Sequence, residues 1–222
     1  MLGNFDLYRI LLSVPAILVA LTFHELSHGY VAYKLGDTTA KSQGRLSINP
    51  LKHLDPIGAL FLLIVGFGWA KPVPVNPYAF KNKDKGMAIV AIAGPAANLI
   101  MALLGGICLL FVNNAYMSAA LSGGSTTALY YLTYFFIYFI QINIVLMVFN
   151  LIPVPPLDGS RVLAAFLSPE MRYRYYQVEQ FGMIIMLAMC LPIFGGSSII
   201  SLILSKPVTA ISTWIYGLAG LV

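Results

Sequence analysis

Long apolar runs alternate with short polar segments along this chain. A run at 57–69 has only 13 residues; a helix of that length covers about 20 Å against about 30 Å of hydrocarbon, which predicts a re-entrant or interfacial segment. The other apolar runs predict transmembrane helices at about residues 8–34, 85–112, 128–151, 181–194 and 199–222. The pattern therefore predicts an all-α polytopic membrane protein, a bundle of about five to six transmembrane helices.

The polar stretch after the first helix is expected to form a short β-hairpin or re-entrant, membrane-associated segment. Glycine and proline interrupt helix in residues 35–56, and the alternating sequence at 45–48 favours a short strand. Residues 71–77 must be extended because their prolines forbid helix. Residues 113–127 carry no charge and are predicted to be a polar loop.

Composition agrees with a membrane protein. Of the 222 residues, 59% are hydrophobic and 9% are charged, whereas an ordinary soluble domain is about 25% charged. We expect one membrane-embedded domain over residues 1–222, with a core at 8–165 and C-terminal helices at 170–222. There is no room for a separate soluble domain of about 100 residues.

The basic residues predict the orientation. Segments 34–85 and 154–180 hold 11 of the 13 lysines and arginines, so both segments should face the cytoplasm of a multi-pass protein in the cell membrane. The N-terminus is then outside. The net charge of +5 is better explained by this rule than by a nucleic-acid partner, so none is expected.

The pentapeptide His24-Glu25-Leu26-Ser27-His28 lies inside the first predicted helix. Imidazoles and carboxylates are costly in hydrocarbon, so their presence needs a reason. Residues four apart share a helix face, so His24 and His28 can bind one metal ion while Glu25 reaches a water on that metal. The spacing predicts a zinc hydrolase site within the membrane, on the cytoplasmic side.

A catalytic zinc usually has three protein ligands. The one remaining histidine is His53, so the third ligand is either His53 or a carboxylate. Among the eight acidic residues, Asp158 stands out, because it follows a predicted span where prolines hold the backbone open. The topology brings Asp158 to the same side of the membrane as the histidine pair, at a similar depth.

Several motifs resemble those of the site-2 protease family of intramembrane zinc metalloproteases, peptidase family M50. They are HELSH at 24–28, GPAAN at 94–98 and NLIPVPPLDG at 150–159. NPLKHLDP at 49–56 and GWAKPVPVNP at 68–77 resemble the small members of the family, which lack PDZ and CBS domains. The resemblance covers about residues 15–165; Ser160 departs from a glycine that is common in the family.

The resemblance implies one Zn²⁺ per chain, bound by His24, His28 and Asp158, with Glu25 as the general base and later the acid. It also suggests substrate or transition-state contacts for Asn150, Asn98 and His53. Each of these three has a structural alternative. Asn150 can cap its helix, Asn98 can bond another helix beside a Gly-Pro notch, and His53 can be held by its loop.

The implied function is hydrolysis of peptide bonds within or near transmembrane segments of membrane proteins, in regulated intramembrane proteolysis. The partners would be a transmembrane protein or peptide substrate and membrane lipid, and a strand edge in 45–48 or 70–77 could pair with the unwound substrate. The alternative is a metal-binding transporter or channel without peptidase activity. No internal repeat supports that alternative, and transport has no evident use for Glu25.

Overall fold

The computed structural model describes residues 7–65, 68–192 and 196–221. Within them the chain is helical, and four helices are long and apolar enough to cross a membrane. These are α1 (Leu7–Lys34), α4 (Lys83–Leu121), α5 (Thr127–Asn150) and α9 (Ile199–Leu218). The prediction of an all-α polytopic membrane protein is confirmed.

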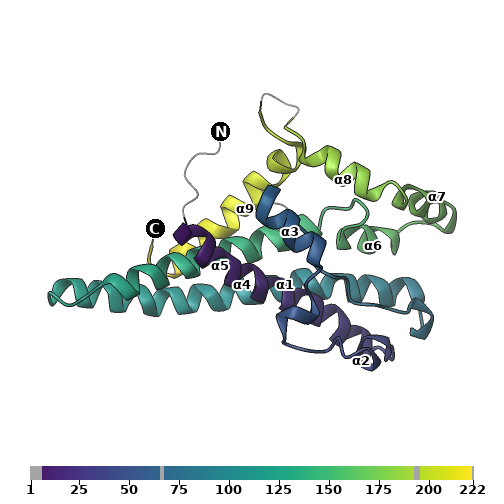
Figure 1. Ribbon diagram of the computed structural model, residues 1–222. Coiled ribbons are helices and arrows are strands. Elements are labelled where there is room, and N and C mark those ends of the chain that lie inside the picture. The colour runs from purple at the N-terminus through teal and green to yellow at the C-terminus, as the bar shows by residue number, and fades with distance from the viewer. Residues whose placement is uncertain (1–6, 66–67, 193–195, 222) are drawn as a thin grey trace.

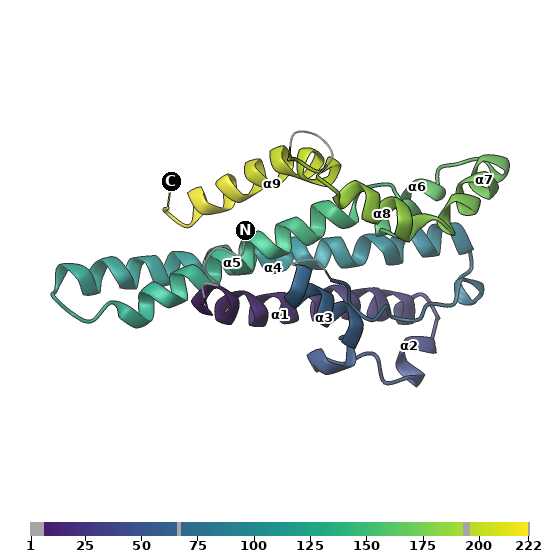
Figure 2. The same cartoon turned by 45° about the horizontal axis from the view of Figure 1, so that its top comes forward.

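The centre of the molecule is the packing of α1, α4 and α5 against one another, with α9 lying along α5 (Figures 1 and 2). Glycines bring the helices close: a Cβ built on Gly105 would lie 2.9 Å from Cδ1 of Phe139, and one on Gly106 would lie 2.7 Å from Cγ2 of Ile215. The buried side chains at this junction are Ala102, Leu109, Ile140, Ile144, Val208, Ile215 and Ala219.

Outward-facing side chains of the long helices are also apolar. On α4, Ile92, Ile100, Ile107 and Phe111 are each at least 45% exposed. A water-soluble helix would carry charged residues on this face, so these side chains are suited to contact lipid.

Short helices lie on two sides of the half of the bundle where α1 and α5 finish and α4 begins (Figure 2). On one side are α2 (Thr39–Ser42) and α3 (Pro56–Val65); on the other are α6 (Asp158–Ala164), α7 (Pro169–Glu179) and α8 (Gly182–Cys190). The 3-10 turns Pro50–Lys52 and Pro77–Ala79 lie in the connection between α2 and α4. Prolines 153, 155 and 156 keep the chain out of helix between α5 and α6.

The structure differs from the predicted hairpin. In the described part of residues 35–82, the only β contact is one antiparallel bridge between Leu54 and Ala70. Arg45 does not alternate as in a strand: its side chain is buried and donates to the carbonyls of Lys71 and Pro72. The β-hairpin prediction is therefore wrong. The Arg45 guanidinium bonds backbone carbonyls inside the protein, so this residue does not take the outward position that an alternating strand requires.

The predicted number of spans is also too high for the described residues. The segment predicted at 181–194 forms α8, whose nine residues extend about 14 Å and cannot cross a membrane; residues 193–195 lie outside the described part. The predicted loop at 113–127 is mostly helix, because α4 continues to Leu121. At 39 residues, α4 is about 58 Å long, so it and α5 extend as a hairpin beyond about 30 Å of hydrocarbon.

Candidate metal centre

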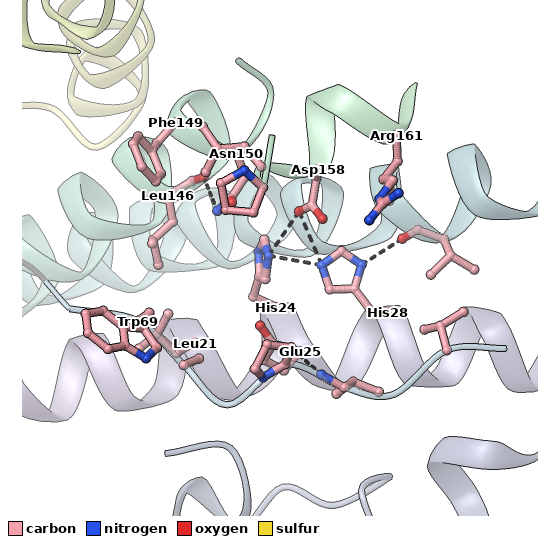
Figure 3. Close-up of a pocket in the computed structure, with 18 of the residues that line it drawn as sticks. Leu21, His24, Glu25, His28, Trp69, Leu146, Phe149, Asn150, Asp158 and Arg161 are labelled. Atoms are coloured by element: carbon pink, nitrogen blue, oxygen red, sulfur yellow. Dashed lines mark hydrogen bonds and ion pairs between the residues drawn. The ribbon is translucent and has the colours of Figure 1, made fainter. Parts of the chain in front are cut away.

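His24 and His28 lie one turn apart on α1 and face α4, where Gly94 leaves room for both rings. A Cβ at Gly94 would lie 2.6 Å from Cε1 of either histidine. Asp158, the first residue of α6, brings its carboxylate to the two imidazole rings from a third helix. These are the residues of the described chain that could hold a metal ion, and they point toward one another in Figure 3.

The ligand atoms form a tight triangle. Nε2 of His24 and Nε2 of His28 are 3.0 Å apart, and Oδ2 of Asp158 lies 3.2 Å from the first and 3.3 Å from the second. Both histidines are buried, and Oδ2 of Asp158 is buried without a hydrogen-bond donor among the described residues.

The remaining ring nitrogens show where the protons lie. Nδ1 of His28 is 2.7 Å from the carbonyl oxygen of Val90, which can only accept, so Nδ1 donates. Nδ1 of His24 is 2.6 Å from Oδ1 of Asn98. The amide nitrogen of Asn98 donates to Ala20 and to Asn143, which leaves its oxygen to accept from His24.

With Nδ1 as the donor, each neutral imidazole presents the lone pair of Nε2 to the centre. When both imidazoles are neutral, two lone pairs and a carboxylate oxygen lie within 3.3 Å of one another. Such an arrangement is repulsive unless a cation lies there, and two His nitrogens with one carboxylate oxygen suit Zn²⁺. The donor set therefore fits a metal, with Asn98 and Val90 holding the ligands from behind.

A cavity of about 530 Å³ opens onto this triangle. Glu25 lines it from α1, Asn150 lines it from the end of α5, and Arg161 lines it from α6 (Figure 3). Arg161 is also ion-paired with Glu179 of α7. Asn150 donates from its amide nitrogen to the carbonyl of Leu146, at 3.0 Å.

The extended residues 71–76, which we call the strap, form a further wall of the cavity. The amide of Val73 donates to Oε2 of Glu25 at 3.0 Å, and the amide of Asn76 donates to Oδ2 of Asp37 at 2.7 Å. Burial raises the pKa of Asp37, but the hydrogen bonds from Thr39 and Asn76 outweigh it and leave that pKa below its ordinary value. Asp37 is thus an anionic anchor for the strap.

Two of the predicted site residues do not line this cavity. Asn98 is fully buried behind His24, where it bonds that ring and Asn143. His53 is 1% exposed, and its Nε2 lies 2.7 Å from the carbonyl of Ser47. These are the contacts that the structural alternatives describe: Asn98 bonds across helices, and His53 bonds its loop. A role of either residue toward the substrate stays a prediction.

Sequence reasoning missed other residues of the site. Asn143 is fully buried on α5 and bonds Asn98; its signal was an amide within an apolar span. The amide of Val73 also had a signal, because prolines on both sides make it the one main-chain donor of residues 72–74. No sequence signal pointed to the carbonyl of Val90.

The fold and this donor set define a helical membrane protein with a cluster of three residues that could hold a metal ion. The sequence profile of peptidase family M50 matches residues 13–193, and the chain belongs to that family of metallopeptidases.

Named relatives agree with this assignment. YwhC of Bacillus subtilis, named as a candidate zinc metalloprotease, is 46% identical over 183 residues, which cover 82% of this chain and 81% of YwhC. Rip2 of Mycolicibacterium smegmatis, named likewise, is 31% identical over 81% of this chain and 66% of its own length. MJ0611 of Methanocaldococcus jannaschii is 29% identical over 72% of this chain and 73% of its own length. No solved structure matches the chain significantly.

Proposed function

We propose that this intramembrane zinc metalloprotease binds its zinc through His24, His28 and Asp158 and uses Glu25 as its general base. The observation that carries the proposal is the buried triangle of three electron-pair donors, 3.0 to 3.3 Å apart, in a chain of peptidase family M50.

Zinc bound by these residues supplies a Lewis acid that polarises a carbonyl and lowers the pKa of water to about 7. The chain's own groups handle the protons: the Glu25 carboxylate takes one from the attacking water and returns it to the amine that leaves. The amide of Val73, 3.0 Å from Oε2, orients this carboxylate. Asn150 lines the cavity, where it can bond the substrate backbone or the developing oxyanion.

The substrates we propose are peptide bonds within or near transmembrane segments, cut in regulated intramembrane proteolysis. A second cavity, of about 520 Å³, adjoins the first and is lined almost wholly by apolar side chains; Leu21, Trp69, Leu146 and Phe149 border both cavities. An apolar substrate segment fits there while its unwound part lies against the strap. Since residues 45–48 form no strand, the strap is the extended segment beside the site. Its Val75 amide and carbonyl are not used by the bonds described above, and they can pair with substrate main chain.

We place the site on the cytoplasmic side of the cell membrane, with the N-terminus outside. The support is the distribution of lysine and arginine, which gather at the end of the bundle that carries Asp158 and the strap. Labelling of single cysteines introduced beside Lys52 and in the 122–126 turn, in intact cells, would test this orientation.

The test of the function compares wild type with Glu25→Gln and Asp158→Ala, measuring zinc content and cleavage of a model transmembrane substrate. We expect about one zinc per chain and cleavage for wild type. Glu25→Gln should keep the zinc and lose cleavage, while Asp158→Ala should lose most of the zinc. A zinc-loaded wild type that cuts nothing and carries zinc across vesicles would replace the proposal with transport.

A further inference from the structure

One peptide group lies between Glu25 and Arg45. Its N–H donates to the Glu25 carboxylate, and its carbonyl accepts from the Arg45 guanidinium. The Pro72 carbonyl and the Val73 amide N–H belong to the same peptide unit. Arg45 donates from one guanidinium nitrogen to this carbonyl at 3.1 Å, and the amide donates to Oε2 of Glu25 at 3.0 Å. We propose that Arg45 is a positioning residue for catalysis, acting on Glu25 through the Pro72–Val73 peptide; this inference rests on the proposed function.

The geometry of a trans peptide supports this role. The peptide unit is planar, and its C=O and N–H point in opposite directions. A guanidinium that holds the carbonyl therefore aims the N–H, here at Glu25. It also polarises the unit, because hydrogen bonds in a chain strengthen one another and a charged donor strengthens them most.

The strap leaves Glu25 no other main-chain donor nearby. Pro72 and Pro74 have no N–H, so within residues 72–74 Val73 alone can donate. The strap also lies tightly on α1 beside this carboxylate: a Cβ built on Gly29, one turn after Glu25, would lie 3.1 Å from Cγ1 of Val73.

Arginine suits this position better than lysine. A second guanidinium nitrogen of Arg45 donates to the carbonyl of Lys71 at 2.6 Å, so the fork fixes two successive carbonyls at once. The side chain is 7% exposed, which keeps water from competing for those carbonyls. A lysine ammonium is a point charge without this fixed fork.

The first experiment compares Arg45→Ala and Arg45→Lys with wild type, measuring zinc per chain, kcat and KM on the same transmembrane substrate. We expect zinc content to stay at the wild-type value and KM to change less than about 3-fold. For Arg45→Ala, kcat should fall about 10- to 100-fold, the usual effect of losing an outer-shell partner, and Arg45→Lys should recover part of it.

Lys52→Ala is the matched control. Lys52 is exposed and also donates to a loop carbonyl, that of Gly44 at 3.1 Å, but it does not bond the strap. Its kcat should equal that of wild type, which would separate general loosening of this loop from loss of the Arg45 contact.

A second measurement tests the route through the peptide. Replacing Val73 by its α-hydroxy analogue turns the amide into an ester. The ester lacks the N–H, and its carbonyl is also a weaker acceptor for Arg45. This ester variant should show a similar fall in kcat, and adding Arg45→Ala to it should cost little more, because both changes interrupt one path.

Three results would overturn the inference: a wild-type kcat in Arg45→Ala, a loss expressed only in KM or zinc content, or full additivity with the ester. Failure of the proposed function looks different, because zinc-loaded wild type would then cleave nothing. The two failures are therefore distinguishable in the same set of assays.

Discussion

Gly94→Ala tests the packing that creates the metal site. The added Cβ would lie 2.6 Å from Cε1 of His24 and from Cε1 of His28. Ordinary contact begins at 3.4 Å, so α4 or the rings must move by at least the difference between 3.4 and 2.6 Å, about 0.8 Å, and further to clear Nε2 of His28, which lies closer still. Both rings are held in a packed interior, where overpacking typically costs about 1–3 kcal/mol of stability.

The same shift would weaken the support of both histidines. Val90 and Asn98 are on α4, at 2.7 and 2.6 Å from the two Nδ1 atoms. Moving α4 away by about 0.8 Å takes these contacts beyond the usual range of about 2.7–3.2 Å. Losing one such partner typically weakens metal binding about 10- to 100-fold, or about 1.4–2.8 kcal/mol. Losing both predicts a decrease of at least about 100-fold.

Zinc affinity is measured by competition with a chelator, beside the unfolding temperature in detergent. Gly105→Ala is the control on the same helix, since its Cβ would lie 2.9 Å from Phe139 and 3.0 Å from Ile140, away from the site. We expect both variants to lose stability and only Gly94→Ala to lose zinc. A Gly94→Ala protein that binds zinc within about 3-fold of wild type would refute this reasoning.

Further predictions concern the outer hydrogen bonds and the metal. Asn98→Leu removes the acceptor for Nδ1 of His24 and should lower zinc affinity about 10- to 100-fold in the same competition assay; an unchanged affinity would mean that Asn98 does not support the ligand. The pKa of Asp37 lies below its ordinary value, so the ionised carboxylate stabilises the folded state. This contribution is complete above the unfolded-state pKa of about 3.9 and is lost as pH falls through the lower folded-state pKa. Asp37→Asn should therefore flatten the dependence of the unfolding temperature on pH in that acid range, and an equal acid dependence in the variant would contradict it. Removing zinc with a chelator should lower the unfolding temperature, and adding zinc back should restore it, because a ligand that binds only the folded state stabilises it; a temperature insensitive to zinc would argue against a bound metal.

The extent of helix was predictable where one physical rule dominates. Apolar runs of membrane length gave α1, α5 and most of α4, because a backbone in lipid must satisfy its own hydrogen bonds. The end of α4 was missed because residues 113–121 are uncharged and partly polar, which predicted a loop. In the structure they continue α4, which forms a hairpin with α5 (Figure 1). The helix α9, which the apolar run at 199–222 predicted, continues through Pro207.

In the polar segment after α1, the alternating sequence at 45–48 predicted a strand that the structure does not contain. Alternation at 45–48 is typical of a strand, but an arginine can satisfy carbonyls anywhere within its reach. In the structure it bonds Lys71 and Pro72, 26 and 27 positions away, and the backbone of this segment forms turns and bends instead. Such a long-range choice of partner leaves no local periodicity to read.

The sequence by itself determined that the chain is a bundle of membrane helices, that His24 and His28 share one helix face, and that Asp158 lies at the same level as that pair. Helix periodicity and the cost of charge in hydrocarbon are local rules, so the residues alone express them. Only the tertiary structure decided that Val90 and Asn98 hold the rings and that the strap reaches Glu25. Those contacts join residues 62 to 74 positions apart for the rings and 48 for the carboxylate, and their positions depend on how closely whole helices and loops can pack.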